Sequence, residues 1–304
     1  GYYGFGNLSD EMLLSVIRQF LAPHRIVAFP VAFLPTNDAL DRLNAFDYLI
    51  LGGGGLFNRT PVPPFDTFDR WASSLQSPIS VLGLGVEQLD PSFIPATHRL
   101  VDQADFFIVR DAESKRLIDH PKVQVAPDLT FYQPLQTAQF GKIEQTVTCG
   151  INLRPLHRGM SEWIRAIAAL PCRKQALPFS LVPTYDDREP LAQIVSSCSD
   201  QASLDDYASL DVVVGTAFHS IVFAIQAGVP AIAINYHPKV RRLMEEVGLA
   251  DFVLEWDEPQ RLLPCFERAL TDRVSIHQTM LSYTERAQKA LAQVLTQVRA
   301  AIDT

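Results

Sequence analysis

One block near the C-terminal third of the chain most constrains what this protein can fold into. An apolar run, Val212–Val214, ends at Gly215, and a helical pattern follows until a Gly-Val-Pro break. A second apolar run, Ala231–Ile234, begins directly after that break. This order predicts a strand–helix–strand unit, and such units build parallel sheets.

Two polar side chains occupy the turns of this unit. His219 falls in the first turn of the predicted helix, where free backbone N–H groups and the helix dipole favour an anion. Lys239 falls just past the second predicted strand, at the edge where parallel α/β sheets bind ligands. We therefore expect an imidazole and an ammonium group to flank one crevice that suits a small, highly charged anion.

The remainder of the chain repeats the same alternation. In the first half we expect strands at 25–29, 48–51, 79–83, 106–109 and 123–125, and helices at 10–20, 38–43, 65–75, 92–103 and 112–119. In the second half we expect further strands at 147–151, 179–182 and 252–254, and helices at 161–170, 189–197 and 259–270. This alternation is typical of parallel sheets with helices on both faces.

The length and the position of a polar stretch indicate two domains. The 304 residues suffice for two α/β domains of about 150 residues each. We read the polar stretch 133–145 as the linker, which gives Rossmann-like domains at 1–138 and 146–274. The last segment, 275–304, carries one apolar stripe at helical spacing and is predicted to cross back to the first domain.

The composition excludes several classes of protein. The net charge of −8 argues against general affinity for nucleic acid, and no apolar stretch reaches about 18 residues, as a membrane span requires. The four cysteines are scattered without metal-site spacing, so we expect no metal and a cytoplasmic location. The chain begins without a methionine, and a preceding strand is one explanation of that start.

Glycine-rich motifs mark several predicted turns of the first half. A loop that opens Gly-Tyr-Tyr-Gly leads into the first helix, four glycines follow the strand at 48–51, and Gly83-Leu84-Gly85 precedes Glu87. Each motif is compatible with an ordinary turn, but four consecutive glycines suggest close approach to a ligand. The candidates for such a role in this half are Asn7, Asp10, Glu11, Gly53, Gly54 and Glu87.

Two arginines follow predicted strands in the same way. Arg110 ends the strand at 106–109 and Arg154 ends the strand at 147–151, so either guanidinium could grip a phosphate or carboxylate at the sheet edge. A structural Arg–Asp pair is the alternative for Arg110, because Asp111 follows it as a predicted helix cap. A plain surface arginine is the alternative for Arg154.

The order of these motifs resembles the polysaccharide pyruvyl transferase family. The matching segments are Gly1-Tyr2-Tyr3-Gly4 with Asn7 and Asp10-Glu11, Gly52–Gly55, Gly83–Gly85, Arg110-Asp111 with Ser114, Ala126-Pro127-Asp128, Phe218-His219-Ser220, and Tyr236 with Pro238-Lys239-Val240. The resemblance implies a GT-B-like pair of domains that face a cleft. It also implies an enzyme that moves the pyruvyl group of phosphoenolpyruvate onto two sugar hydroxyls as a cyclic ketal and releases phosphate.

The resemblance also assigns roles. The histidine and lysine of the family correspond to His219 and Lys239, and its upstream arginine corresponds to Arg110, so these three are expected to be catalytic. From their positions we expect that Arg154, Phe218 and Ser220 help to bind the donor and that the first-half candidates bind the acceptor. No cofactor is implied. The family usually has an arginine two residues before the histidine and a glycine before Asp-Glu, where this chain has Ala217 and Ser9.

Two other functions stay open at this point. A GT-B glycosyltransferase with a nucleotide sugar would also use a cationic cleft, and a relative that lost activity with the arginine at position 217 would bind without turnover. The acceptor sugar, a lipid attached to it, a peripheral membrane location and the oligomeric state are not fixed by the sequence.

Overall fold

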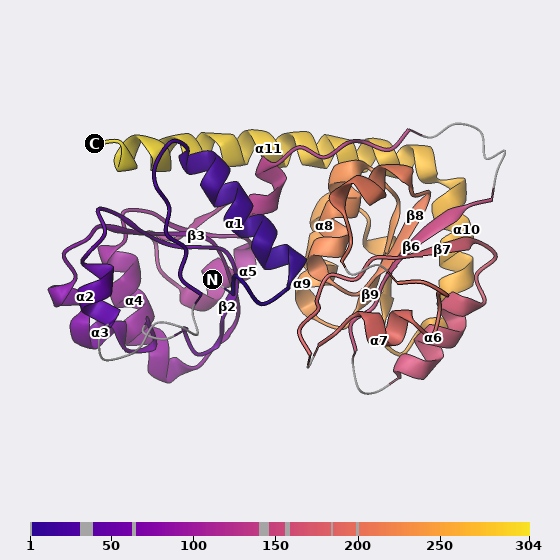
Figure 1. The fold of residues 1–304 in the computed structure, drawn as a ribbon, viewed down its shortest axis with the longest axis horizontal. Coiled ribbons are helices and arrows are strands. Elements are labelled where there is room, and N and C mark those ends of the chain that lie inside the picture. The colour runs from indigo at the N-terminus through magenta and orange to yellow at the C-terminus, as the bar shows by residue number, and fades with distance from the viewer. Residues whose placement is uncertain are drawn as a thin grey trace. The chain divides into compact units, whose positions relative to one another are not determined.

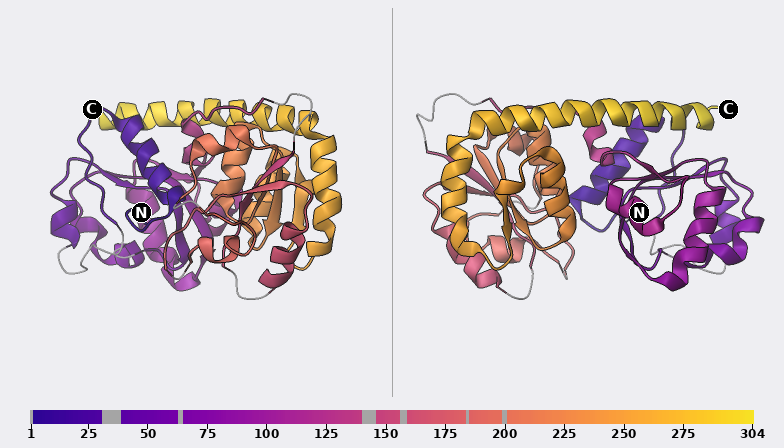
Figure 2. Two further views of the ribbon diagram at one scale, coloured as in Figure 1. Left: turned by 45° about the vertical axis from the view of Figure 1, so that its right-hand side comes forward. Right: turned by 180° about the vertical axis from the view of Figure 1, so that it is seen from behind.

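The computed structural model describes residues 2–30, 39–62, 65–139, 146–155, 159–183, 185–198 and 201–304. The chain divides into two compact units, and each has its own parallel sheet (Figures 1 and 2). Unit 1 comprises Gly1–Gly4, Asp10–Gln133 and Ala287–Thr304, and unit 2 comprises Phe5–Ser9 and Pro134–Arg286. The predicted α/β class with two parallel-sheet domains is confirmed.

The sheet of unit 1 has five described strands, and all of their pairings are parallel. These strands are β1 (Leu49–Leu51), β2 (Gly54–Arg59), β3 (Ile79–Leu89), β4 (Phe107–Val109) and β5 (Gln124–Val125). Their order is β1-β3-β4-β5, and β2 also pairs with β3. The first eight residues of β3 are all buried, as expected of a strand covered on both faces.

Helices surround this sheet and complete the first part of the chain. The α-helices are α1 (Leu8–Leu21), α2 (Ala39–Leu43), α3 (Phe68–Trp71), α4 (Ile94–Gln103) and α5 (Ala112–Ile118). The 3-10 turns are η2 (Phe65–Thr67), η3 (Ala72–Ser74), η4 (Pro91–Phe93) and η5 (Leu129–Tyr132). Apolar side chains of α3, α4, β3 and β4 form one continuous core, which explains why these short elements hold together.

The sheet of unit 2 also has five described strands in parallel, with the order β10-β9-β8-β6-β7. They are β6 (Thr148–Asn152), β7 (Arg173–Ala176), β8 (Val212–Gly215), β9 (Ala231–Asn235) and β10 (Val253–Glu255). The helices and turns are α6 (Met160–Ala168), α7 (Arg188–Leu191), η6 (Leu204–Ser209), α8 (Phe218–Ala227), α9 (Pro238–Val247), η7 (Ala250–Phe252), η8 (Pro259–Arg261) and α10 (Leu262–Thr271). Helices α8 and α9 lie on one face of this sheet, and α6 and α10 lie on the other (Figure 1).

The long C-terminal helix α11 (Arg273–Ile302) contributes residues to both units. Within unit 2, the hydroxyl of Thr284 donates to the carbonyl of Ile225. Within unit 1, the guanidinium of Arg299 donates to the carbonyls of Phe20 and Ala22 at the end of α1. Buried apolar side chains and these hydrogen bonds fix each half of the helix to its own unit.

The strand predicted at 25–29 is wrong, because these residues have no strand structure. A cavity of about 360 Å³ separates this segment from β1, and residues 25–29 and 48–51 line it together with apolar residues of α1. In the part of the chain that the structure describes, only β3 pairs with β1. The segment 25–29 has the composition of a strand, but among the described residues no strand pairs with it in a ladder of hydrogen bonds.

Three further expectations about local structure need correction. The sequence predicts a strand that ends at Gly83, but β3 continues to Leu89 because β2 pairs along it. The sequence did not predict β2, because its first residues are glycines. The strand expected at 179–182 lies earlier, as β7, where four largely polar residues form an edge strand. The helix expected at 189–197 is the single turn α7, and residues 140–145 of the expected linker lie outside the described residues.

We predict that Leu291→Ala destabilises the protein by about 2–5 kcal/mol, because Leu291 of α11 is fully buried and its loss leaves a cavity. The matched control is Gln293→Ala on the exposed face of the same helix, which should change stability by less than about 0.5 kcal/mol. Urea unfolding measures both variants. Equal losses for the two would contradict a docked apolar face on this half of α11.

Candidate functional site

Three neighbouring strands of unit 2 end at the same edge of their sheet. In the ladder, Asn152 of β6 pairs with Gly215 of β8, and Gly215 lies beside Ala233 of β9. The segments that follow these strands carry Arg154, His219 and Lys239 respectively. The parallel register therefore brings the three predicted donor-side residues of this unit to one sheet edge.

His219 is the second residue of α8, whose N-cap is Ala217. Its side chain is buried, with 7% of the residue exposed, and its ring lies against the rings of Phe218 and Phe223 at 5.2 and 6.1 Å between centroids. Ser220 is also buried, and its hydroxyl lies 3.1 Å from that of Tyr207. Burial raises the pKa of Tyr207, so its phenol stays protonated and can donate to Ser220.

Lys239 is the second residue of α9, so it occupies the same place in its helix as His219 does in α8. The ring of His237 caps α9, because its Nδ1 accepts a hydrogen bond from the backbone N–H of Lys239 at 3.4 Å. Both helices begin directly after a strand of the same parallel sheet. The first turns of both helices thus lie at the same edge of the sheet, where helix N-termini favour an anion.

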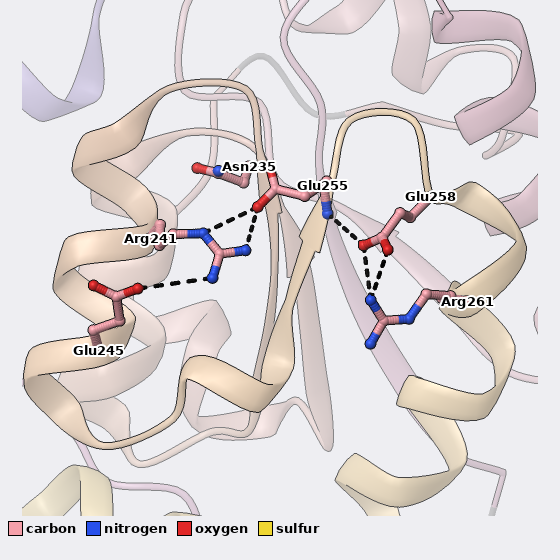
Figure 3. A network of polar contacts seen from close by, with 6 residues as sticks. All are labelled: Asn235, Arg241, Glu245, Glu255, Glu258 and Arg261. Atoms are coloured by element: carbon pink, nitrogen blue, oxygen red, sulfur yellow. Dashed lines mark hydrogen bonds and ion pairs between the residues drawn. The ribbon is translucent and has the colours of Figure 1, made fainter.

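An ion-pair network fixes the start of α9 beside β10 (Figure 3). Glu255 accepts hydrogen bonds from the amide of Asn235 at 2.9 Å and from the guanidinium of Arg241. The hydrogen bond from Asn235 and the adjacent positive charge lower the pKa of Glu255. Its own backbone N–H donates to Glu258, which also pairs with Arg261. The network joins the last residue of β9, the first turns of α9 and the end of β10.

Asn152 links three loops at the same edge. Its side-chain oxygen accepts a hydrogen bond from the backbone N–H of Ala217 at 2.9 Å, directly before α8. Its amide nitrogen donates to the carbonyl of Leu177 at 2.8 Å and to the carboxylate of Asp187 at 3.3 Å. Nearby, the hydroxyl of Thr216 accepts from the backbone N–H of Arg154 at 2.9 Å.

Asp187 is a fully buried carboxylate in this network. Its Oδ2 also accepts hydrogen bonds from the backbone N–H groups of Phe179 and Ser180, at 2.9 and 3.0 Å. Burial raises the pKa of Asp187 to about 6, and these hydrogen bonds together with the positive charge of Arg154 oppose that rise. The sequence analysis did not identify Asn152 or Asp187 as site residues. Asp187 lies in an Asp-Asp-Arg-Glu segment, which has the pattern of a solvated helix start.

The raised pKa of Asp187 predicts a pH dependence of stability. The folded protein keeps this proton up to about pH 6, whereas the unfolded chain releases it near pH 3.8, so the folded state binds more protons between these values. The free energy of unfolding should therefore fall by roughly 2 kcal/mol from pH 4 to pH 6 on account of this group. Asp187→Asn should abolish this part of the pH dependence.

The measurement is urea unfolding of both proteins from pH 4 to pH 7, followed by the fluorescence of Trp163 and Trp256, which both belong to unit 2. The stability of wild type should decline relative to the variant as the pH rises. Parallel curves would show that the pKa of Asp187 is not raised by folding.

Arg110 lies directly after β4 in unit 1, and its side chain is only 4% exposed. Its guanidinium nitrogens lie 3.7 Å from a carboxylate oxygen of Asp111 and 3.9 Å from one of Asp128. Asp128 in turn accepts hydrogen bonds from the N–H and hydroxyl of Thr130. The structure thus places Arg110 in a buried charged cluster of its own unit, while its role toward a donor stays a prediction.

Gly85 makes room for this guanidinium. A Cβ added at Gly85 would lie 2.6 Å from the guanidinium of Arg110, closer than packed atoms approach. We predict that Gly85→Ala costs about 1–3 kcal/mol, because the arginine must leave its carboxylate neighbours. The control Gly55→Ala places its Cβ 3.4 Å from Glu87, an ordinary contact at an exposed residue, and should be nearly neutral. Equal thermal stability of the two variants would refute this account.

The structure brings some of the predicted acceptor-side residues of unit 1 together. Gly54 has φ +102°, a conformation that favours glycine, and lies beside the carboxylate of Asp10. Gly53 is buried against Leu13 and Leu129, so protein atoms cover part of it. Glu87 lies on β3, next to Gly55.

The two remaining acceptor-side candidates have local partners. Glu11 accepts a hydrogen bond from the backbone N–H of Gly4 at 2.5 Å in unit 1. The side-chain oxygen of Asn7 accepts one from the backbone N–H of Ser9 in unit 2. The acceptor roles of all these residues stay predictions.

The described residues contain neither a metal-binding cluster nor a membrane-spanning helix. No group of three or more histidine, cysteine, aspartate or glutamate side chains in those residues could hold a metal ion. Within the same part of the chain, no helix is long and apolar enough to cross a membrane.

The sequence matches a family. Residues 10–238, three quarters of the chain, match the model of the polysaccharide pyruvyl transferase family. The protein therefore belongs to the polysaccharide pyruvyl transferases and is a transferase by family. A search of curated proteins returned no match.

Several solved structures have similar folds, and three of them contain UDP or UDP-GlcNAc. Anabaena Alr3699/HepE in complex with UDP is 14% identical, with a TM-score of 0.59 over 88% of this chain and 81% of that one. The S. aureus MnaA–UDP co-structure is 11% identical, with a TM-score of 0.56 over 91% of this chain and 89% of that one. UDP-GlcNAc 2-epimerase from Neisseria meningitidis, bound to UDP-GlcNAc, is 11% identical, with a TM-score of 0.56 over 96% of this chain and 97% of that one. At such low identity these matches establish the GT-B-like fold alone.

Proposed function

We propose that this protein transfers the pyruvyl group of phosphoenolpyruvate to two hydroxyls of a sugar in a polysaccharide or its precursor. The product is a cyclic pyruvate ketal, and phosphate is released. The observation that carries this proposal is the matched placement of His219 and Lys239 in the first turns of two neighbouring helices, in a chain of this family.

The charges at this edge suit the donor. Phosphoenolpyruvate carries a carboxylate and a phosphate of charge about −1.5 to −2. The first turns of α8 and α9, the ammonium of Lys239 and the guanidinium of Arg154 supply the partial and full positive charges that such an anion needs. Phe218 and Ser220 complete the proposed donor side, and we include Arg110 of unit 1 as a further donor-binding residue.

The proposed reaction balances without a cofactor. A sugar hydroxyl adds to C2 of the enol while C3 gains a proton, and His219 is the proposed acid for that step. The C2–O bond to phosphate then breaks, and the second hydroxyl closes the ketal as its proton passes to the departing phosphate. Asp10 and Glu87 are the two candidates for the base that receives the proton of the first hydroxyl, and Asn7, Glu11, Gly53 and Gly54 are proposed to contact the acceptor.

One observation favours a second function. Proteins with a similar fold hold UDP, and a cationic edge also suits a diphosphate. Calorimetric titration of wild type with phosphoenolpyruvate and with UDP at one fixed salt concentration separates the two functions. Binding of UDP alone would replace our proposal with a nucleotide-sugar glycosyltransferase. Binding of phosphoenolpyruvate without turnover on any acceptor would indicate a relative that lost activity, since position 217 lacks the arginine usual in the family.

We predict that His219→Ala and Lys239→Ala each weaken phosphoenolpyruvate binding about 10- to 150-fold, because each removes a charge-assisted hydrogen bond of roughly 1.5–3 kcal/mol. The matched control is Lys174→Ala, which removes the same charge near the start of β7 in the same unit. Calorimetry at constant salt measures all three variants. If the control weakened binding as much as Lys239→Ala, only the net charge would matter, and our site would be wrong.

A further inference from the structure

The hydrogen-bond acceptors beside Asn152 determine which way its amide points. The ionised carboxylate of Asp187 and the backbone carbonyl of Leu177 only accept hydrogen bonds, so the amide nitrogen of Asn152 faces both of them. The side-chain oxygen then faces the opposite way, where it accepts from the backbone N–H of Ala217. Asp187 and Leu177 therefore hold this amide together.

Asp187 is itself held rigidly. It is fully buried, its Oδ2 accepts two backbone N–H groups from the loop after β7, and its own N–H donates to the carbonyl of Ser180 at 2.9 Å. Although Asp187 occupies the N-cap position of α7, its side chain makes no capping bond there. Its carboxylate serves the loops at the strand ends and not its own helix.

The link from Asp187 ends at the turn that presents His219. Ala217 is the N-cap of α8, so the hydrogen bond from its N–H to Asn152 fixes the backbone two residues before His219. The N–H of Thr216 donates to the carbonyl of Asn152 at 3.0 Å, which anchors the same turn from the backbone. The entry into α8 is therefore tied to β6 by one backbone bond and one side-chain bond.

We infer that Asp187 is a positioning residue of the donor site: together with the carbonyl of Leu177 it orients Asn152, which holds the first turn of α8 and with it His219. This inference rests on the proposed function for its effect on phosphoenolpyruvate. The structural consequence of the inference, a fixed backbone at Ala217, does not depend on the proposed function. Asp187 touches no reacting group, so its contribution reaches the donor only through Asn152.

The test compares Asp187→Ala with Asp187→Asn and with the control Asp186→Ala. Asp187→Ala removes the acceptor, whereas Asp187→Asn keeps an oxygen for the N–H groups of Phe179, Ser180 and Asn152. Asp186 pairs with the partly exposed Arg188 and takes no part in the network. Asp187→Ala should weaken phosphoenolpyruvate binding about 5- to 100-fold and speed hydrogen exchange of the Ala217 amide about tenfold, whereas Asp187→Asn and Asp186→Ala should alter neither.

A double-mutant cycle with Asn152→Ala tests the route of the effect. If Asp187 acts through Asn152, the double variant should bind phosphoenolpyruvate no more weakly than Asn152→Ala alone. Additive losses, unchanged protection of the Ala217 amide in Asp187→Ala, or equally weak binding by Asp187→Asn would overturn the inference. If wild type did not bind phosphoenolpyruvate, the proposed function would fall, and amide exchange would still decide the role of Asp187.

Discussion

The parallel ladder β6–β8–β9 is the constraint on which the candidate site depends. Its register aligns Asn152, Gly215 and Ala233, so the chain leaves three neighbouring strands at one edge. Two of these exits enter helices at once, and the first turns of those helices carry His219 and Lys239. A shift of one residue in this ladder would turn every side chain of the shifted strand to the other face and move the two helix starts out of alignment.

Each unit buries a charged side chain close to the end of a strand, with opposite sign. Unit 1 buries Arg110 between two carboxylates, and unit 2 buries Asp187 among hydrogen-bond donors. Burying a charge is costly unless partners surround it, so both positions restrict the local backbone strongly. In unit 2 that restriction reaches the entry of α8, because Asn152 bridges Asp187 and Ala217.

Close packing explains much of the glycine pattern in unit 1. Gly85 leaves space for the guanidinium of Arg110, and Gly52 leaves space for the hydroxyl of Tyr3. The phenol of Tyr3 is buried beside Asp10 and Glu11, and burial raises its pKa. These glycines therefore have a packing role whether or not a substrate also approaches them. The sequence pattern alone could not separate the two roles, since both require a missing side chain.

The sequence by itself determined the α/β class, the two parallel sheets and the family, because apolar runs, glycine breaks and the order of motifs are local signals. It also placed His219 and Lys239 at helix starts, since a strand followed by a turn leaves few alternatives. Only the tertiary structure revealed the link from Asp187 to Ala217, because its members lie 35 and 65 residues from Asn152 along the chain. The segment 25–29 shows the same limit, because strand composition becomes a strand only where a neighbouring strand accepts its hydrogen bonds.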